Sequence, residues 1–194
     1  MIYSNKKPYI FKRNSFEAYS NYVDTHISNV MKADKEYRRL LYPYMLQRLG
    51  KTEEQDRKCP YFHNIELTLK NHDETKFSDE EFRPYAAKFF PTRRDINNKE
   101  TVDKNFELAW KHHYENNPHH PEFWIDKGGV MTTRFFYEMI LDWIAVSMYY
   151  KSSVNDWYFK NPSGRKEKST LLPESDILLL DKIFSENKFD FSES

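Results

Sequence analysis

The sequence predicts an all-α, single-domain helical bundle. Apolar residues recur every three or four positions in several separate segments, which is the period of an amphipathic helix. The chain shows no internal repeat and no convincing pair of strands. Its 194 residues are enough for one sizeable core and do not require a second. We therefore expect one domain over residues 1–194, with a core at about 14–152 and a C-terminal extension, 153–194, that carries a short helix.

Composition narrows the classes of function. Lysine plus arginine (30) balance aspartate plus glutamate (30), so no overall field gathers nucleic acid or anionic membrane. Cys59 alone cannot form an internal disulfide, and the sequence has neither a signal-type N-terminus nor a long apolar run. We expect a soluble, cytoplasmic protein that does not bind membranes and for which nucleic acid is a poor partner. Whether it forms a homo-oligomer stays open.

The first helix is predicted to begin at Asn14, which with Glu17 resembles a capping box. An apolar stripe follows at helical spacing, made of Phe16, Tyr19, Val23, Ile27, Val30 and Met31. His26 falls on this stripe, so we expect its imidazole to face the interior.

Two more helices are expected before residue 92. The first runs from about Phe62 to Asn71, where Ile65 and Leu69 predict an inner face that ends with His72 and Asp73. In the second, Ser78 with Glu81 resembles a capping box. That helix carries Phe82, Tyr85, Ala86 and Phe89 and ends before Pro91. A polar, basic linker is then expected from Thr92 to about Glu100.

A fourth helix is expected to begin near Thr101. Its inner stripe is Val102, Phe106, Ala109 and His113. His113 therefore faces the core better than its neighbour His112. Asn117 and Pro118 end this helix and leave His119 and His120 on a constrained loop.

The longest apolar helix is predicted from Thr132 to Tyr150, after a Gly128-Gly129 turn. Asp142 lies in its apolar stripe, and a buried carboxylate needs a partner, a metal or a proton. A polar loop is expected over Asn161–Thr170. A terminal helix then starts at Pro173 and packs through Ile177, Leu180 and Phe184.

The predicted helices and loops bring inward His and Asp residues from several elements toward one interior. Neutral imidazoles and carboxylates are ligands for Zn, Fe, Mn or Ni, and helical bundles build such sites in their cores. Each residue alone has a simpler explanation, because a single inward histidine is usually a hydrogen-bonded core residue and paired loop histidines are often solvated. Together they favour a metal site.

The order of these residues resembles the HD-domain superfamily of metal-dependent phosphohydrolases, named for its His-Asp pair. The run His72-Asp73-Glu74-Thr75-Lys76 is similar to that superfamily's frequent His-Asp-x-x-Lys form. More narrowly, Ala109–His120 with Glu138-Met139 and Asp142-Trp143 resembles a small family of bacterial and phage proteins that brings no established reaction. The resemblance runs from about Tyr19 to Phe184 and implies a bundle of the HD-domain type.

The superfamily resemblance implies a mono- or dinuclear centre. Its first metal would be held by His26, His72, Asp73 and Asp142. A second metal would use Asp73 as a bridge, with His113 and His120 as its histidine ligands. His112 and His119 are alternates or hydrogen-bond donors behind the ligands. The doubled His-His pairs depart from the superfamily pattern and leave the count open at one or two divalent ions, with Mn, Fe, Co, Ni or Zn expected and Mg also open.

The resemblance further implies hydrolysis of a phosphoester by a metal-activated water, with a nucleotide or another small phosphorylated molecule as substrate. Asp73 is expected to orient the water, and Lys76 to bind the anionic substrate because it lies within one turn of the ligands. Arg134, Arg93 and Arg94 are further cationic candidates, for which solvated surface charges are the alternative.

Two other classes of function remain open. Some proteins of this fold hold a mixed-valent di-iron centre and activate oxygen, and the number of ligands here would suit two irons. A non-enzymatic binding module with a purely structural metal is the other alternative.

Overall fold

The computed structural model describes residues 15–58 and 65–193, and within these ranges every named element is a helix. The prediction of an all-α, single-domain fold is confirmed. The elements are α1 Ser15–Leu49, α2 Glu53–Lys58, α3 Ile65–Lys70, the 3₁₀ helix η1 Glu74–Phe77, α4 Phe82–Phe89, α5 Arg93–Asn97, α6 Lys99–Asn116, α7 Pro121–Asp126, α8 Thr133–Tyr150, α9 Val154–Lys160, α10 Arg165–Lys168 and α11 Glu174–Glu186.

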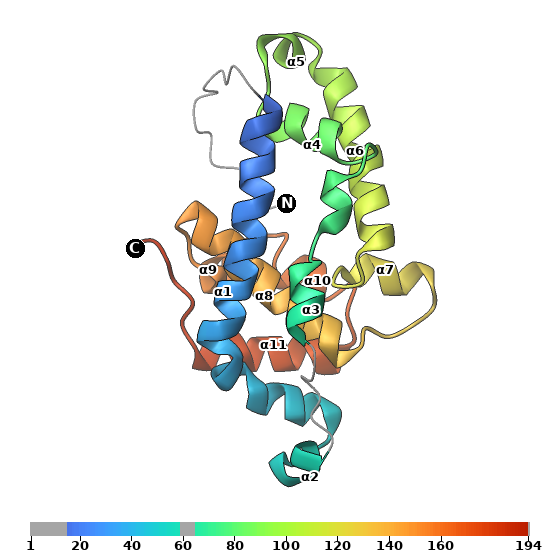
Figure 1. The fold of residues 1–194 in the computed structure, drawn as a ribbon. Coiled ribbons are helices and arrows are strands. Elements are labelled where there is room, and N and C mark those ends of the chain that lie inside the picture. The colour runs from blue at the N-terminus through green and yellow to red at the C-terminus, as the bar shows by residue number, and fades with distance from the viewer. Residues whose placement is uncertain (1–14, 59–64, 194) are drawn as a thin grey trace.

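The long helices α1 and α8 form the centre of the fold, because they share the most extensive helix–helix contact (Figure 1). Helices α3 and α4 also pack on α1, and α6 packs on α4 and α7. Helix α11 packs against α1 and α9. Helix α5 lies at one end of the molecule (Figure 1).

Most of the buried apolar residues in the described ranges form two clusters. The larger cluster joins α1, α8 and α11 and includes Val30, Ile140 and Leu180. The smaller one lies where the start of α1 meets α4 and α6, and it includes Tyr19, Val23, Tyr85, Ala86, Phe106 and Ala109. His26, on α1 between Val23 and Val30, therefore lies where the two clusters meet.

The predicted inner faces of the long helices are observed. His26, His72 and His113 are each 1% exposed, whereas His112 is half-buried, as its helical phase predicts. The terminal helix buries its predicted residues Ile177, Leu180 and Phe184.

The prediction of a capping box at Ser78 and Glu81 was wrong. Glu81 does precede α4, but its side chain makes no capping hydrogen bond. Its carboxylate accepts hydrogen bonds from His112 and His113 instead. The two histidine N–H donors therefore orient this carboxylate, in place of the backbone N–H group that a capping box would supply.

The linker expected over residues 92–100 contains α5, which a Thr92–Asp95 capping box begins, and the first residues of α6. The loop expected over residues 161–170 contains the single turn α10. Helices α2, α7 and α9 were not predicted either. Such short helices carry too few turns for an apolar stripe to stand out. The residues Asn14, Cys59 and Phe62 lie outside the described ranges.

A largely buried arginine, 11% exposed at its side chain, links the end of α1 to two other helices. Arg48 donates to both carboxylate oxygens of Asp176 on α11, at 2.8 Å each. It also donates to Thr133 Oγ1 at 2.8 Å and to the carbonyl oxygen of Met131 at 2.6 Å, at the start of α8. One guanidinium group thus joins three helices.

A helix that spans a bilayer must be both long and apolar. None of the described helices combines enough residues with enough apolar character to span a membrane.

Candidate metal centre

The centre is built around a strained turn. Helix α3 ends at Lys70, and the chain then passes through His72 and Asp73 into η1. Asp73 has φ 59° and ψ 23°, the left-handed conformation that non-glycine residues seldom adopt. Backbone strain of this kind is concentrated at functional sites. The turn buries the Asp73 carboxylate, which is 1% exposed, among histidines from three other segments.

Four side chains form ligand group 1, namely His26, His72, Asp73 and Asp142. His26 Nε2 lies 3.2 Å from His72 Nε2, 3.3 Å from Asp73 Oδ2 and 3.0 Å from Asp142 Oδ1. His72 Nε2 lies 3.4 Å from Asp73 Oδ2 and 3.5 Å from Asp142 Oδ1. Two ligands of one ion are about 2.9–3.5 Å apart, since each lies about 2.0–2.2 Å from the ion. These spacings therefore fit a single metal ion.

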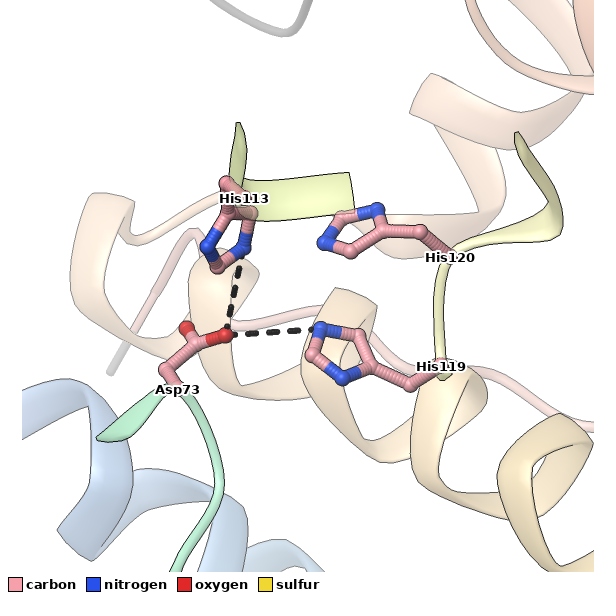
Figure 2. Close-up of side chains that lie close together, drawn as sticks. All are labelled: Asp73, His113, His119 and His120. Carbon is pink, nitrogen blue, oxygen red and sulfur yellow. Dashed lines mark ion pairs between the residues drawn. The ribbon is translucent and has the colours of Figure 1, made fainter. Parts of the chain in front are cut away.

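Asp73, His113, His119 and His120 form ligand group 2. Figure 2 shows the three imidazoles and one oxygen of Asp73 facing a common point. Asp73 Oδ1 lies 3.3 Å from His113 Nε2 and 3.4 Å from His119 Nε2, and the His120 ring centroid is 4.3 Å from that of His119. His113 comes from α6, whereas His119 and His120 come from the loop before α7.

The two groups share one carboxylate. Asp73 directs Oδ2 toward group 1 and Oδ1 toward group 2. A carboxylate divided in this way has the arrangement of a bridging ligand between two ions.

Buried polar atoms without partners support this fit. Asp73 Oδ1, His119 Nε2 and His120 Nε2 are buried and have no hydrogen-bond partner among the described residues. Buried polar atoms are normally hydrogen-bonded, so unpartnered ones require an explanation. All three belong to group 2, and a cation would satisfy them together. The buried His, Asp and Glu residues can thus hold a metal ion.

Charge favours a cation at the same place. The carboxylates of Asp73, Glu81, Glu138 and Asp142 are buried or nearly so, and Lys76 is the ammonium beside them. Lys76 Nζ donates to Asp73 Oδ2. When the imidazoles are neutral, as metal ligands must be, four carboxylates and one ammonium carry a net charge of −3. Uncompensated buried charge is strongly unfavourable, and divalent ions would compensate it.

The pKa values of the ligands follow this charge balance. Burial alone would lower the pKa of His72, but the carboxylates of Asp73, Asp142 and Glu138 raise it to about 10. Burial would raise the pKa of Asp73, yet the positive charges of His72 and Lys76 hold it well below its usual range. Burial, together with neighbouring imidazolium charge, holds the pKa values of His119 and His120 well below the usual range of histidine. His119 and His120 therefore present neutral imidazoles, the form that binds metals. In His113, burial lowers the pKa, but the carboxylates of Asp73 and Glu81 raise it above the usual value.

Two carboxylates that sequence reasoning missed lie behind the ligands. Glu138 Oε1 accepts a hydrogen bond from His72 Nδ1 at 2.8 Å, and Glu81 Oε2 accepts one from His113 Nδ1 at 2.8 Å. Each bond leaves the Nε2 atom of its imidazole free to face the ligand group. Glu138 could have been noticed because it lies one helical turn before Asp142 on the same face of α8. His112, an expected alternate ligand, donates to the other oxygen of Glu81, and it belongs to neither group of ligand atoms found among the described residues.

A cavity of about 560 Å³ reaches both ligand groups, touching Asp73, Asp142, His113 and His120. Its walls are rich in aromatic rings, including Tyr85, Phe106, Trp110, Trp143 and Trp157, and its cationic groups are Lys76, Lys88 and Lys168. Its volume is within the range of small-molecule sites.

Of the cationic residues predicted to bind substrate, only Lys76 lines this cavity. Arg93 and Arg94 are exposed on α5. Arg134, on α8, donates to Thr68 Oγ1 instead. Lys88 and Lys168 were not predicted, because neither is close in sequence to a ligand.

The chain matches, over residues 15–185, the model of a family described as "Family of unknown function (DUF5662)". No curated protein and no solved structure matches the chain.

Proposed function

The chain belongs to the DUF5662 family, a family of unknown function, and we propose from its ligand groups that it is a metal-dependent phosphohydrolase of the HD-domain type. Its substrate on this proposal is a nucleotide or another small phosphoester. The observation that carries the proposal is the divided carboxylate of Asp73, whose oxygens face two adjacent groups of metal-ligand atoms. Paired ions that share ligands are common in enzymes that cleave phosphate esters.

The cavity supports catalysis over a purely structural metal. Structural metal sites are closed by protein ligands, whereas catalytic sites keep a position open to substrate. Here the cavity reaches residues of both ligand groups. A small molecule in the cavity would lie directly against the centre.

The chain's own residues have separate roles in this proposal. Metal ions bound at the centre would supply Lewis-acid catalysis and lower the pKa of a water molecule. Asp73 would hold that water's orientation through its Oδ atoms, and Glu138 and Glu81 keep the Nε2 atoms of His72 and His113 turned toward the centre. Lys76, which is 9% exposed and lines the cavity, offers an ammonium group to the oxygens of a bound phosphate.

The test is metal content per chain, followed by a panel of nucleotides and small phosphoesters with Mn, Co, Fe, Ni, Zn or Mg added. We expect bound divalent metal and phosphate release, both lost in Asp73→Asn, which keeps the size of the side chain but removes its charge. Folded, metal-loaded protein that leaves the whole panel unhydrolysed would overturn the proposal.

A di-iron oxygenase is the second candidate. It is favoured by the two adjacent four-residue groups with one shared carboxylate, since such a set suits two irons as well as two hydrolytic ions. Protein purified in air should then hold iron near two ions per chain and show an iron electronic spectrum. One iron per chain or less contradicts this candidate.

A further inference from the structure

Two histidines from different ligand groups lie side by side between two carboxylates. The rings of His72 and His119 are 4.3 Å apart at their centroids. Their Nε2 atoms each lie 3.4 Å from a different oxygen of Asp73. Their Nδ1 atoms both face Oε1 of Glu138, at 2.8 Å for His72 and 3.5 Å for His119. Asp73 therefore faces the metal side of both rings, and Glu138 faces the opposite side.

We propose that Glu138 is a positioning residue that couples the two metal sites. Glu138 Oε1 accepts the Nδ1–H of His72 from group 1 and lies 3.5 Å from Nδ1 of His119 from group 2, so a single carboxylate sets the direction of both Nε2 lone pairs. When the first ion binds to one of these histidines, Glu138 becomes fixed and holds the other histidine in place for the second ion. A change at Glu138 should therefore alter the metal affinities of both groups. The inference rests on the metal centre of the proposed function and not on the hydrolytic reaction.

The position of Glu138 supports this role. It is 3% exposed, and its Oε2 atom has no hydrogen-bond partner among the described residues. A carboxylate buried so deeply is unfavourable unless other groups compensate it. It lies one turn before Asp142 on α8, so the same helix face supplies a ligand to group 1 and a support to both groups.

Direct metal binding by Glu138 is the competing interpretation, since Glu138, His72 and His119 also lie close enough to hold an ion. The 2.8 Å between Glu138 Oε1 and His72 Nδ1 is the length of a charge-assisted hydrogen bond. A hydrogen on Nδ1 leaves only Nε2 of His72 for a metal. The geometry thus favours a support over a third ligand group.

Glu81 provides a matched control. It is also fully buried, at 0% exposure, and its two oxygens each accept from a histidine Nδ1 at 2.8 Å. Only one of these histidines, His113, belongs to a ligand group, because His112 lies outside both. Removing the charge of Glu81 should therefore affect group 2 alone.

The experiment titrates the metal-free full-length protein with Co²⁺ and follows binding by calorimetry and by the visible absorption of the bound ion. We expect two Co²⁺ per wild-type chain. Glu138→Gln should weaken both sites by about 10–100-fold, the usual effect of losing a carboxylate behind a histidine ligand. Glu81→Gln should weaken one site by a similar factor and leave the other unchanged.

Several results would overturn the inference. They are an unchanged pair of affinities in Glu138→Gln, a loss confined to one site, or a third Co²⁺ in the wild type that this variant loses. Circular dichroism checks folding, and Glu138→Met provides a second variant without charge. If neither metal-free variant folds, Glu138 is a structural residue and the inference is wrong.

The same titration separates this inference from the proposed function. A wild-type chain that binds two ions but cleaves no phosphoester overturns the hydrolase and leaves the coupling intact. A chain that binds one ion and cleaves phosphoesters overturns the coupling and leaves the hydrolase intact.

Discussion

Asp73 combines two demands in one residue: a backbone with φ 59° and a carboxylate that faces both ligand groups. Aspartate meets both, since it tolerates the left-handed region better than most residues. Glycine would meet only the first demand, and alanine neither. The two requirements can therefore be measured separately.

Replacing Asp73 by glycine or by alanine separates strain from ligation. Both variants lose the carboxylate and leave Lys76 without its partner, so neither should bind metal. They differ in backbone freedom, and we expect Asp73→Gly to be more stable than Asp73→Ala by about 1 kcal/mol. Chemical denaturation of the metal-free proteins measures the difference. An alanine variant as stable as the glycine variant would show that the left-handed turn carries no strain.

The adjacent histidines of α6 offer a second residue-scale test. His113 is 1% exposed and faces Asp73, while His112 is half-buried and belongs to neither ligand group. We expect His113→Ala to lose the ion of group 2 and His112→Ala to keep the wild-type metal content, because only His113 supplies an Nε2 ligand. Elemental analysis of both variants decides, and equal metal loss in the two contradicts the assignment.

Helical periodicity predicts His113 but cannot choose between His119 and His120. The α6 residues follow a fixed period of 3.6, so His113 must share a face with Phe106 and Ala109. The later pair lies on a loop, where no period applies. The structure brings both loop histidines into group 2, although His119 was expected only as an alternate. Glu81 and Glu138 were missed because their role appears only once the histidines they contact are in place.

At the scale of elements, the apolar stripes in the sequence predict the long helices. They do not predict the polar contacts that join one helix to another. Arg48 shows why. Its partners Asp176 and Thr133 are 128 and 85 residues away in sequence, and nothing local in the chain identifies them. Similarly, α5 depends on the Thr92–Asp95 capping box and has no buried residue of its own.

The Arg48 joint should be a large contributor to stability. Arg48→Met leaves the carboxylate of Asp176, 4% exposed, buried without its main partner. Removing one partner of a buried ion pair typically costs about 3–5 kcal/mol. The exposed pair of Arg165 and Asp181 is the control, and Arg165→Met should cause a far smaller loss in the same urea denaturation series. If the two variants lost similar amounts of unfolding free energy, the Arg48 contacts would not be a large contributor to stability.

At the scale of the whole molecule, the candidate metal centre lies where the two hydrophobic clusters meet. Its ligands come from α1, the turn before η1, α6, the loop before α7, and α8. A metal ion bound here would therefore stabilise contacts between segments distant in sequence. The all-α fold can be predicted from the sequence. The way these segments bring their ligands together depends on long-range packing, which the sequence pattern does not reveal.

Metal removal should lower thermal stability. An ion present at a hundredfold excess over its dissociation constant contributes about 2.7 kcal/mol, which for a chain of this size corresponds to about 5–10 °C in Tm. We expect EDTA to lower the Tm of the wild type by this amount and to leave that of Asp73→Asn unchanged, as followed by circular dichroism. An equal EDTA effect on both proteins would mean that the stabilising ion binds elsewhere.

The separation of the buried apolar residues into two clusters also affects local opening of the fold. The cluster of α4 and α6 is the smaller one, and group 2 ties α6 to the Asp73 turn through His113. Without metal, the backbone amides of α6 should exchange with deuterium much faster than those of α8, which is buried along most of its length. With metal bound, the amides of α6 and α8 should exchange at similar rates. The metal would then make the two hydrophobic clusters unfold as one unit.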